Sequence, residues 1–149
     1  MNNKILFWID DSLIHFGIAH SLQKLSNFEL YSIISVANKK KDFFKKQNLV
    51  EFKNIWFHND IEINTSLSHS VEYLEQFEKK YDIDLWKLIY NDRIFYNFNE
   101  FYKFTRDQVL GIVEQEIRFF EKILDDVKPD FVFLLPVLRP SYLFYLICK

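Results

Sequence analysis

The sequence predicts an α/β fold in which an open, Rossmann-like parallel sheet is flanked by helices. Two observations lead to this prediction. Short runs that are apolar throughout alternate with longer segments of helical periodicity, and the apolar runs are rich in β-branched and aromatic residues. Strands that are apolar on both faces are typical of parallel sheets, whose connections are right-handed crossovers. We expect the strand order 3-2-1-4 in this sheet.

The N-terminal part of the chain is predicted to supply three of the strands and two helices. Asp10, Asp11 and Ser12 follow the first apolar run and offer N-cap oxygens to the helix behind them. The apolar residues of that helix recur at helical spacing as far as Ser26-Asn27. The strands are expected over residues 4–9, 29–36 and 54–57, and a basic helical segment over residues 39–48.

The middle of the chain is predicted to be helical. Ser66 or Ser68 is expected to cap a helix whose apolar face carries Val71, Leu74 and Phe77. A short apolar segment follows at residues 85–90.

The longest helix is expected over residues 105–127. Thr105 and Gln108 have the spacing of a capping box at its start, and Lys128-Pro129 ends it because the residue before proline avoids the α region. One continuous apolar stripe runs along the segment and is formed by Val109, Ile112, Val113, Ile117, Phe120, Ile123, Leu124 and Val127.

The apolar stretch 131–148 is not expected to span a membrane. Arg139 lies inside it between Pro136 and Pro140, and these residues would break a spanning helix where water cannot satisfy the freed backbone groups. We expect a buried strand over residues 131–135 and a separate helix from Tyr142. The short N-terminal apolar run does not have the pattern of a signal peptide.

Composition excludes several classes of site and partner. The length of 149 residues predicts one domain, and a net charge of −2 gives no general attraction to nucleic acid. A single cysteine rules out an internal disulfide. Gly17 and Gly111 are the only glycines, so the sequence holds neither a GxGxxG loop nor a Walker A loop. His15 and His20 lack the spacing of a helical zinc pair, and we expect no metal and no cofactor.

The polar residues that follow the first strand form the first candidate site. Ligands of open parallel sheets bind at the carboxyl ends of the strands, beside the point where the strand order reverses. That rule places one side of a crevice at residues 136–141, which include Arg139, and the other side at Asp10, Asp11, Ser12 and His15. A histidine held by a neighbouring carboxylate can act as a general base. The alternative is that the aspartates cap the helix and His15 is a surface residue of its first turn.

Two further segments carry charge beside aromatic rings. Arg93 lies in the aromatic stretch 90–104 and could bind a phosphate or a carboxylate, although a structural pair with Asp92 explains it equally well. The lysines of residues 39–46 have two phenylalanines between them. They could contact an anionic membrane surface, but a solvated helix face is the favoured interpretation.

The order of these elements resembles the N-terminal domain of GT-B-type glycosyltransferases. It is most similar to the archaeal and bacterial capsule or surface polysaccharide biosynthesis proteins. The residues that carry the resemblance are the opening KILFWIDDSLIHFGIAHSL and the middle block DLWKLIYNDRIFYNFNEFYKFTRD, followed by the helix and strand EQEIRFFEKILDDVKPDFVFLLP.

The resemblance implies sugar transfer from a nucleotide-sugar donor to a cell-surface or capsular glycan. This would take place in the cytoplasm, with at most peripheral contact to a membrane and without an obligatory metal. The N-terminal domain of such enzymes mainly holds the acceptor, and the catalytic base often follows the first strand. Carried over to this chain, the base is His15, with Asp11 as second choice, and substrate contacts are expected at Asp10, Ser12, Arg93 and Arg139. Asp-Asp-Ser replaces the glycine-rich turn that is frequent in the family at this point.

The family's donor nucleotide binds mostly to a second Rossmann-like domain, which we expect to be absent from these residues. The chain 1–149 is therefore expected to be a single, partial GT-B-like domain that is inactive alone and needs a partner to supply the other half. The alternative from another class is a non-catalytic α/β module that binds a protein through a sheet edge or its aromatic loop. A peripheral membrane protein that uses residues 39–46 is a third interpretation.

Overall fold

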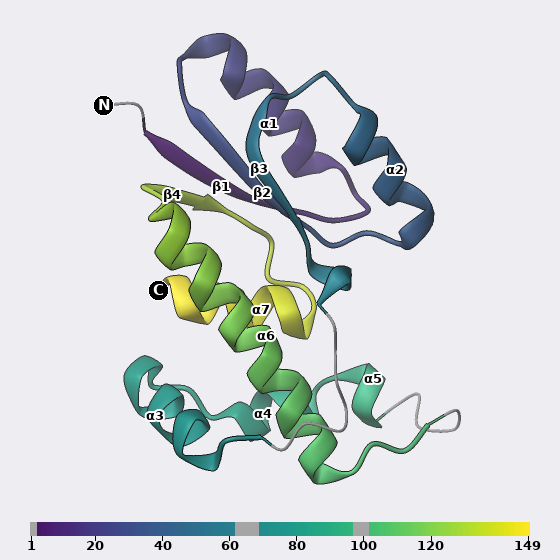
Figure 1. Cartoon of the computed structure of the whole chain (residues 1–149), viewed down its shortest axis with the longest axis vertical. Helices are drawn as coiled ribbons and strands as arrows, with labels where there is room; N and C mark the ends of the chain where they lie inside the picture. The colour runs from purple at the N-terminus through teal and green to yellow at the C-terminus, as the bar shows by residue number, and fades with distance from the viewer. Residues whose placement is uncertain (1–2, 62–68, 97–101) are drawn as a thin grey trace. The chain divides into compact units, whose positions relative to one another are not determined.

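The structure is a computed structural model that describes residues 3–61, 69–96 and 102–149. The chain divides into two compact units. Unit 1 comprises residues 1–61 and 122–135, and unit 2 comprises residues 62–121 and 136–149. Each unit is described by itself below, with its elements labelled as in Figure 1.

Unit 1 contains a four-stranded sheet with the order β3-β2-β1-β4, and every pair of neighbouring strands is parallel. The predicted strand order is confirmed. The strands are β1 (Lys4–Ile9), β2 (Glu29–Ile34), β3 (Phe52–Phe57) and β4 (Phe131–Phe133). The prediction placed the ends of β2 and β4 two residues too late and the start of β3 two residues too late. A four-stranded parallel sheet with helical connections is consistent with a Rossmann-like fold.

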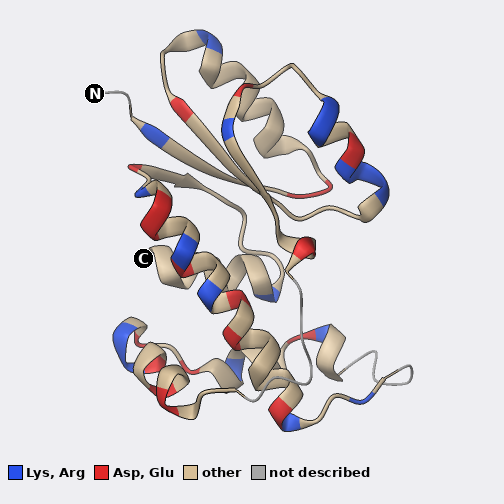
Figure 2. Ribbon diagram, viewed as in Figure 1, with Lys and Arg blue, Asp and Glu red and all other residues tan. Residues whose placement is uncertain are grey.

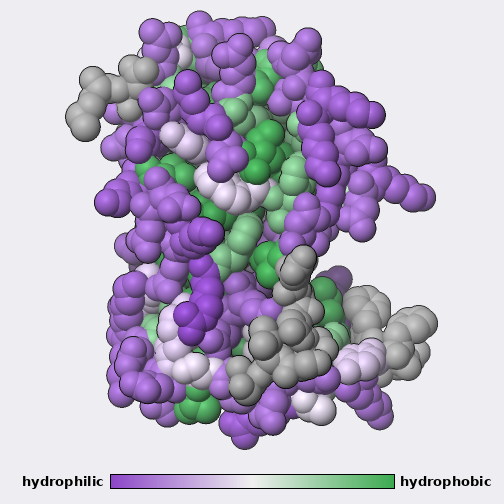
Figure 3. All heavy atoms as spheres, in the orientation of Figure 1, coloured by the Kyte–Doolittle hydropathy of each residue, from purple (hydrophilic) through white to green (hydrophobic). Residues whose placement is uncertain are grey.

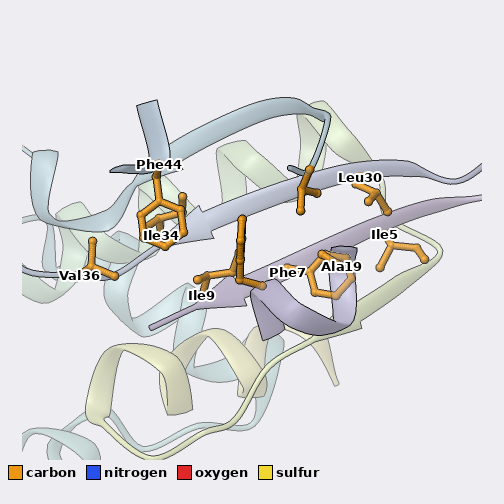
Figure 4. Packing of buried hydrophobic residues seen from close by; sticks show 10 residues of the cluster. Ile5, Phe7, Ile9, Ala19, Leu30, Ile34, Val36 and Phe44 are labelled. Carbon is orange, nitrogen blue, oxygen red and sulfur yellow. The ribbon is translucent and has the colours of Figure 1, made fainter. Parts of the chain in front are cut away.

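The core of unit 1 lies between this sheet and two helices, α1 (Ile14–Leu25) and α2 (Asn38–Lys46). Alternate residues of β1 and β2 point to the same face, where α1 adds Phe16 and Ala19 and α2 adds Phe44 (Figure 4). Hydrophilic residues cover the outer side of α2 (Figure 3). The two helices therefore each bury one apolar stripe, as amphipathic helices on a sheet must.

The entry to β4 is tied to the start of β1. Lys4 donates its backbone N–H to Asp130 Oδ2 at 2.7 Å and its ammonium to the Val127 carbonyl at 2.9 Å. Lys128 takes a left-handed conformation, with φ of 49°, and ends the preceding helix at Val127. The helix end predicted at Lys128-Pro129 is confirmed.

Unit 2 is helical in its described residues. It contains α3 (Val71–Tyr81), α4 (Leu85–Tyr90), α5 (Arg93–Tyr96), the larger part of α6 (Arg106–Val127) and α7 (Arg139–Cys148). The predicted capping box is confirmed, because Thr105 and Gln108 exchange two hydrogen bonds of 2.9 and 3.2 Å.

The cap of α3 differs from the prediction. Ser70 accepts the Tyr73 N–H at 3.3 Å, whereas Ser66 and Ser68 lie outside the described residues. The helix predicted from Tyr142 begins at Arg139, since Pro140 fits the first turn of a helix, where its missing N–H costs nothing.

The stretch 131–148 separates into β4 and α7, as predicted, but the expectation that this strand is buried is wrong: Phe131 is exposed, and Val132 and Phe133 are only partly buried. Among the described residues, no helix has both the length and the apolar character that crossing a membrane requires.

A buried hydroxyl interrupts the apolar face of the sheet in unit 1. Ser32 is fully buried on β2, opposite Phe7 of β1. Its Oγ has no hydrogen-bond partner among the described residues. A buried polar group without a partner costs free energy because its hydration is lost and nothing replaces it.

We expect Ser32→Ala to stabilise unit 1 by about 1 kcal/mol, because the substitution removes the unpaired hydroxyl. Urea denaturation should show a higher midpoint at an unchanged slope. Ser21→Ala is the matched control, since Ser21 is exposed and bonds only to the Gly17 carbonyl of its own helix. A Ser32→Ala midpoint below that of the parent chain contradicts this account.

Candidate functional site

The loop after β1 is held by its own side chains. Asp10 Oδ1 accepts the Ser12 backbone N–H at 3.0 Å and also the Ser12 hydroxyl, which closes an Asx turn. Leu13 then adopts the left-handed region with φ of 60°, and α1 begins at Ile14. The expectation that Asp10 and Asp11 cap this helix is wrong: the N-cap residue is Leu13, which has no capping side chain.

The left-handed Leu13 is a strained position. A residue with a Cβ costs roughly 1–2 kcal/mol in this region relative to the right-handed one, and glycine avoids that cost. Such strain is maintained only where the surrounding structure determines the turn, and it concentrates at functional loops. The tight turn after β1 is made by Asp10, Ser12 and Leu13 without a glycine.

His15 is half-buried in the first turn of α1 and reaches back to the sheet. Its Nδ1 lies 2.8 Å from the carbonyl oxygen of Trp8 on β1. A carbonyl oxygen only accepts, so Nδ1 must carry the proton in this contact. The neutral ring therefore keeps its lone pair on Nε2, which is the form that a general base needs. The group that fixes the tautomer is a backbone carbonyl rather than the carboxylate that the sequence suggested.

Asp11 points to a different partner. Its Oδ1 lies 2.9 Å from the Lys40 ammonium of α2 in a pair that is more than half exposed. This contact engages Asp11 with α2, whereas His15 is oriented by the backbone of β1, so the geometry favours His15 as the base.

The lysines of α2 are partly neutralised by such pairs. Besides Lys40, the buried Lys41 bonds to Asp60 and lies 5.7 Å from the Phe57 ring centre. Lys45 also lies 5.5 Å from the centre of this ring, and the remaining lysines, at the two ends of α2 in Figure 2, are exposed. This arrangement agrees with a solvated helix face.

A second histidine lies at the carboxyl end of the sheet. His58 begins the short helix η1 (His58–Asp60) directly after β3, and its ring is 5.5 Å from the Trp8 indole. Sequence spacing gave no reason to group His58 with His15. The parallel pairing of β1, β2 and β3 brings both histidines against Trp8, one through its carbonyl and the other through its ring.

A polar cavity of about 720 Å³ lies at the opposite edge of the sheet. Its lining includes Gln23, Asn27, Glu29 and Glu51, at the amino-terminal ends of β2 and β3. Sites of open parallel sheets form at the carboxyl ends. We therefore do not assign this cavity to the site of His15.

Arg139, in unit 2, is held by two buried carboxylates. Its guanidinium bonds to Asp92 through Nε and to both oxygens of Glu116, one of them at 3.1 Å. All three side chains are buried. Burial alone would lower the pKa of Arg139, but the charges of Glu116 and Asp92 outweigh it and hold that pKa above its ordinary value. Asp92 also accepts the Ile94 N–H at 2.8 Å and thereby fixes the start of α5.

These contacts change the expected role of Arg139. A guanidinium whose donors already face two carboxylates binds a substrate anion only if the cluster opens. Residues 136–141 belong to unit 2, and Arg139 stabilises the interior of that unit. Arg93 differs, since it is exposed on α5 and Asp92 pairs with Arg139 instead.

Unit 2 also contains a cavity of about 310 Å³ with mainly aromatic walls. Trp86 and Tyr90 come from α4, while Phe95 and Tyr96 come from α5. The lining is completed by Phe104, Arg106 and Val109. The sequence marked the aromatic stretch 90–104 but not Trp86 or Arg106 as part of one site. The capping box fixes Arg106 as the first residue of α6 and was the local signal that could have placed this arginine beside the aromatic stretch.

One carboxylate connects α3 to α6 within unit 2. Glu121 accepts hydrogen bonds from the Tyr73 hydroxyl at 2.7 Å, the Lys80 ammonium at 2.9 Å and the Tyr81 hydroxyl at 3.1 Å. Burial alone would raise the pKa of Glu121, but these three donors outweigh it and lower that pKa below 4.5. The donors also satisfy the carboxylate, which makes the cluster structural.

No group of three or more histidine, cysteine, aspartate or glutamate side chains among the described residues is arranged to hold a metal ion. The comparisons with known proteins give no match: no protein-family model, no curated protein and no solved structure matches this chain.

Arg139 and Arg93 are expected to differ strongly in what they contribute to the stability of unit 2. Arg139→Met leaves Asp92 and Glu116 buried without their cation, which should lower the free energy of unfolding by about 3–5 kcal/mol. Arg93→Met, at an exposed position, should change it by less than about 0.5 kcal/mol. Chemical denaturation of both variants checks this, and equal effects contradict the assignment of Arg139 to the interior.

The Glu121 cluster predicts an acid-side loss of stability. Because the folded-state pKa of Glu121 is below 4.5, its stabilisation is complete above that pH and is lost as the pH falls through the folded-state pKa. Glu121→Gln should flatten the decline of stability in this acid range. Glu75→Gln, an exposed residue of α3, is the control and should leave the slope unchanged. If Glu121→Gln leaves the pH dependence of stability unchanged in this range, Glu121 is not the source of the acid-side loss.

Proposed function

We propose that this chain forms the acceptor side of a GT-B-like glycosyltransferase of cell-surface or capsular polysaccharide synthesis, with His15 as the general base. The supporting observation is the 2.8 Å contact between His15 Nδ1 and the Trp8 carbonyl. It orients the ring and leaves Nε2 as the proton acceptor. The all-parallel sheet supports the same proposal, since His15 follows the carboxyl end of its central strand β1.

In the proposed step, Nε2 of His15 removes the proton from a hydroxyl group of the acceptor glycan. That oxygen forms the new bond to the anomeric carbon of the donor sugar. The bond between the anomeric carbon and the donor phosphate breaks, and the nucleotide leaves with the electron pair. The donor nucleotide is assigned to a second Rossmann-like domain, so this chain contributes the base and the acceptor contacts.

Asp10 and Ser12 contribute to the proposed site by shaping its loop. Their mutual hydrogen bonds use one carboxylate oxygen of Asp10, Oδ1, and this side chain is partly exposed. A glycan hydroxyl can donate to the second oxygen of this carboxylate. Arg93 is the exposed cation proposed to contact the acceptor or a phosphate. Arg139 is not proposed for this role, because it forms buried ion pairs with Asp92 and Glu116.

A non-catalytic interaction module is the second candidate function. The observation that favours it is the exposure of large apolar side chains in unit 2. Val137 and Leu138 are 68% and 66% exposed, and Ile94 is 58% exposed. Apolar side chains that form a contiguous exposed patch mark protein interfaces, and Val137 and Leu138 are neighbours in the sequence. A stable complex with a protein partner, with no binding of sugar or nucleotide, favours this candidate.

The proposed base predicts the effect of one substitution. His15→Asn keeps a side-chain N–H that can donate to the Trp8 carbonyl but removes Nε2, so sugar transfer should fall by roughly 10²–10⁴-fold. Transfer is measured from a panel of nucleotide sugars to a surface-glycan acceptor, with the donor-binding domain supplied. His20→Asn is the control on the same helix and should retain full activity.

Full transfer by His15→Asn would rule out the base. Absence of transfer by the parent chain together with a folded donor domain would rule out the glycosyltransferase proposal as a whole. Both variants are first compared with the parent by thermal unfolding, because only a folded chain tests the chemistry.

A further inference from the structure

We propose that the aromatic cavity of unit 2 is a binding subsite for an anionic sugar, a pyranose ring that carries a carboxylate or a phosphate. This inference rests on the proposed function, since it names the class of acceptor that the chain would hold. It stands on a separate set of residues, which are Trp86, Tyr90, Phe95, Tyr96, Phe104, Arg106 and Val109.

The cavity has the size and the wall of a small-molecule site. Its volume of about 310 Å³ is near the lower end of the range for such sites, roughly 300–1,000 Å³. The rings of Trp86 and Tyr90 have centres 5.6 Å apart, and those of Tyr90 and Tyr96 have centres 5.3 Å apart. These three rings form one continuous wall.

The shape of the wall favours a sugar over a flat ring. Neighbouring rings are tilted by 38° and 36° to each other, so their faces line a curve and not a parallel slot. A nucleobase stacks best between parallel faces. A pyranose is puckered, and the C–H groups of its faces can lie against several tilted rings while its hydroxyls reach the polar edges of Tyr90 and Tyr96. Tyr90 is 64% exposed, which leaves that edge open to a ligand.

Arg106 supplies a positive charge at this wall. Its guanidinium carbon lies 4.7 Å from the centre of the Trp86 ring. A guanidinium that lies close to an indole ring can still donate its N–H groups to an anion. Within the described residues, no carboxylate forms an ion pair with Arg106. This contrasts with Arg139, whose donors are used by two carboxylates.

Arg106 is the one cation among the described residues that line the cavity, and its charge decides which ligands fit. It disfavours a quaternary ammonium ligand, which an aromatic cage would otherwise attract. One guanidinium matches one carboxylate or one phosphate group. A nucleoside diphosphate carries more negative charge than this wall can neutralise. The cavity therefore suits a sugar with one anionic substituent better than a nucleotide donor.

The walls are held in place before any ligand arrives. Asp84 caps α4 by accepting the Lys87 N–H at 3.2 Å, and the Thr105–Gln108 box fixes the first turn of α6 under Arg106. Asp92 and Arg139 secure α5, which carries Phe95 and Tyr96. Phe95 and Val109 are buried and form the floor. Such preorganisation reduces the entropy that binding has to overcome.

The test is direct binding to the whole chain, without any donor. The probes are a disaccharide that ends in glucuronic acid, the same disaccharide with glucose in that place, glucose 6-phosphate and uridine diphosphate. Saturation-transfer NMR identifies the ligand protons that contact the protein, and tryptophan fluorescence gives the dissociation constant. We expect the anionic sugars to bind at least tenfold more tightly than the neutral disaccharide, with the aromatic wall touching the C–H groups of the ring.

Arg106→Gln should remove that preference and weaken binding of the anionic sugars at least tenfold, with little effect on the neutral one. Tyr96→Ala should weaken both. Lys79→Gln, which removes the same charge from the exposed side of α3, should change neither. Comparison of glucuronate with glucose 6-phosphate shows which anion the site prefers.

Three results would overturn the proposal: no binding of any sugar, tighter binding of uridine diphosphate than of the anionic sugars, or an equal loss in Lys79→Gln and Arg106→Gln. Failure of the proposed glycosyltransferase function is distinguishable, because His15→Asn should bind the anionic disaccharide as tightly as the parent chain does. Binding without transfer retains the subsite and rejects the enzyme. His15-dependent transfer without binding retains the enzyme and rejects the subsite.

Discussion

The backbone of β1 is the constraint on which unit 1 depends. Both of its edges must be paired because the strand is buried, and its carbonyls alternate between the two neighbours. Ile9 offers its carbonyl toward β2, where Ser35 donates at 2.8 Å, and Lys4 offers its carbonyl to Asp130 at 2.9 Å. On the side of β1 that faces β4, the carbonyls after that of Lys4 belong to Leu6 and Trp8, and β4 ends at Phe133. The imidazole of His15 donates to the Trp8 carbonyl beyond the end of β4. This hydrogen bond satisfies the carbonyl and also sets the tautomer of the proposed base.

A buried ion cluster has the corresponding role in unit 2. Arg139 connects the start of α7 to Glu116 of α6 and to Asp92, which precedes α5. Breaking such a cluster is costly, because the charges that remain have neither water nor a partner. The cluster also faces the Phe95 ring, 5.1 Å from the guanidinium carbon. The buried ion cluster therefore packs against Phe95, which lines the aromatic cavity. Arg139, which the sequence assigned to substrate binding, belongs to this cluster.

Local sequence rules predicted the elements well and their long-range contacts poorly. Apolar runs and helical periodicity indicated the strands and helices, and the spacing of Thr105 and Gln108 indicated the capping box, since these signals lie within a few residues of one another. The strand order followed from the general rules for parallel α/β sheets. Asp92 and Arg139 are 47 residues apart, and no local pattern indicates that they meet. Glu114 and Glu116 are buried on α6 although carboxylates are usually exposed. The N-cap of α1 was predicted wrongly because Asp10 binds Ser12 in a turn instead of capping the helix.

The tautomer of His15 in the folded chain is the property that tests the role of this residue most directly. Long-range ¹H–¹⁵N correlation NMR of the imidazole, recorded at a pH where the ring is neutral, distinguishes a proton on Nδ1 from a proton on Nε2. We expect the proton on Nδ1, as the 2.8 Å contact with the Trp8 carbonyl requires. A proton on Nε2, or equal populations of the two tautomers, would contradict both the hydrogen bond and the role of His15 as a preoriented base.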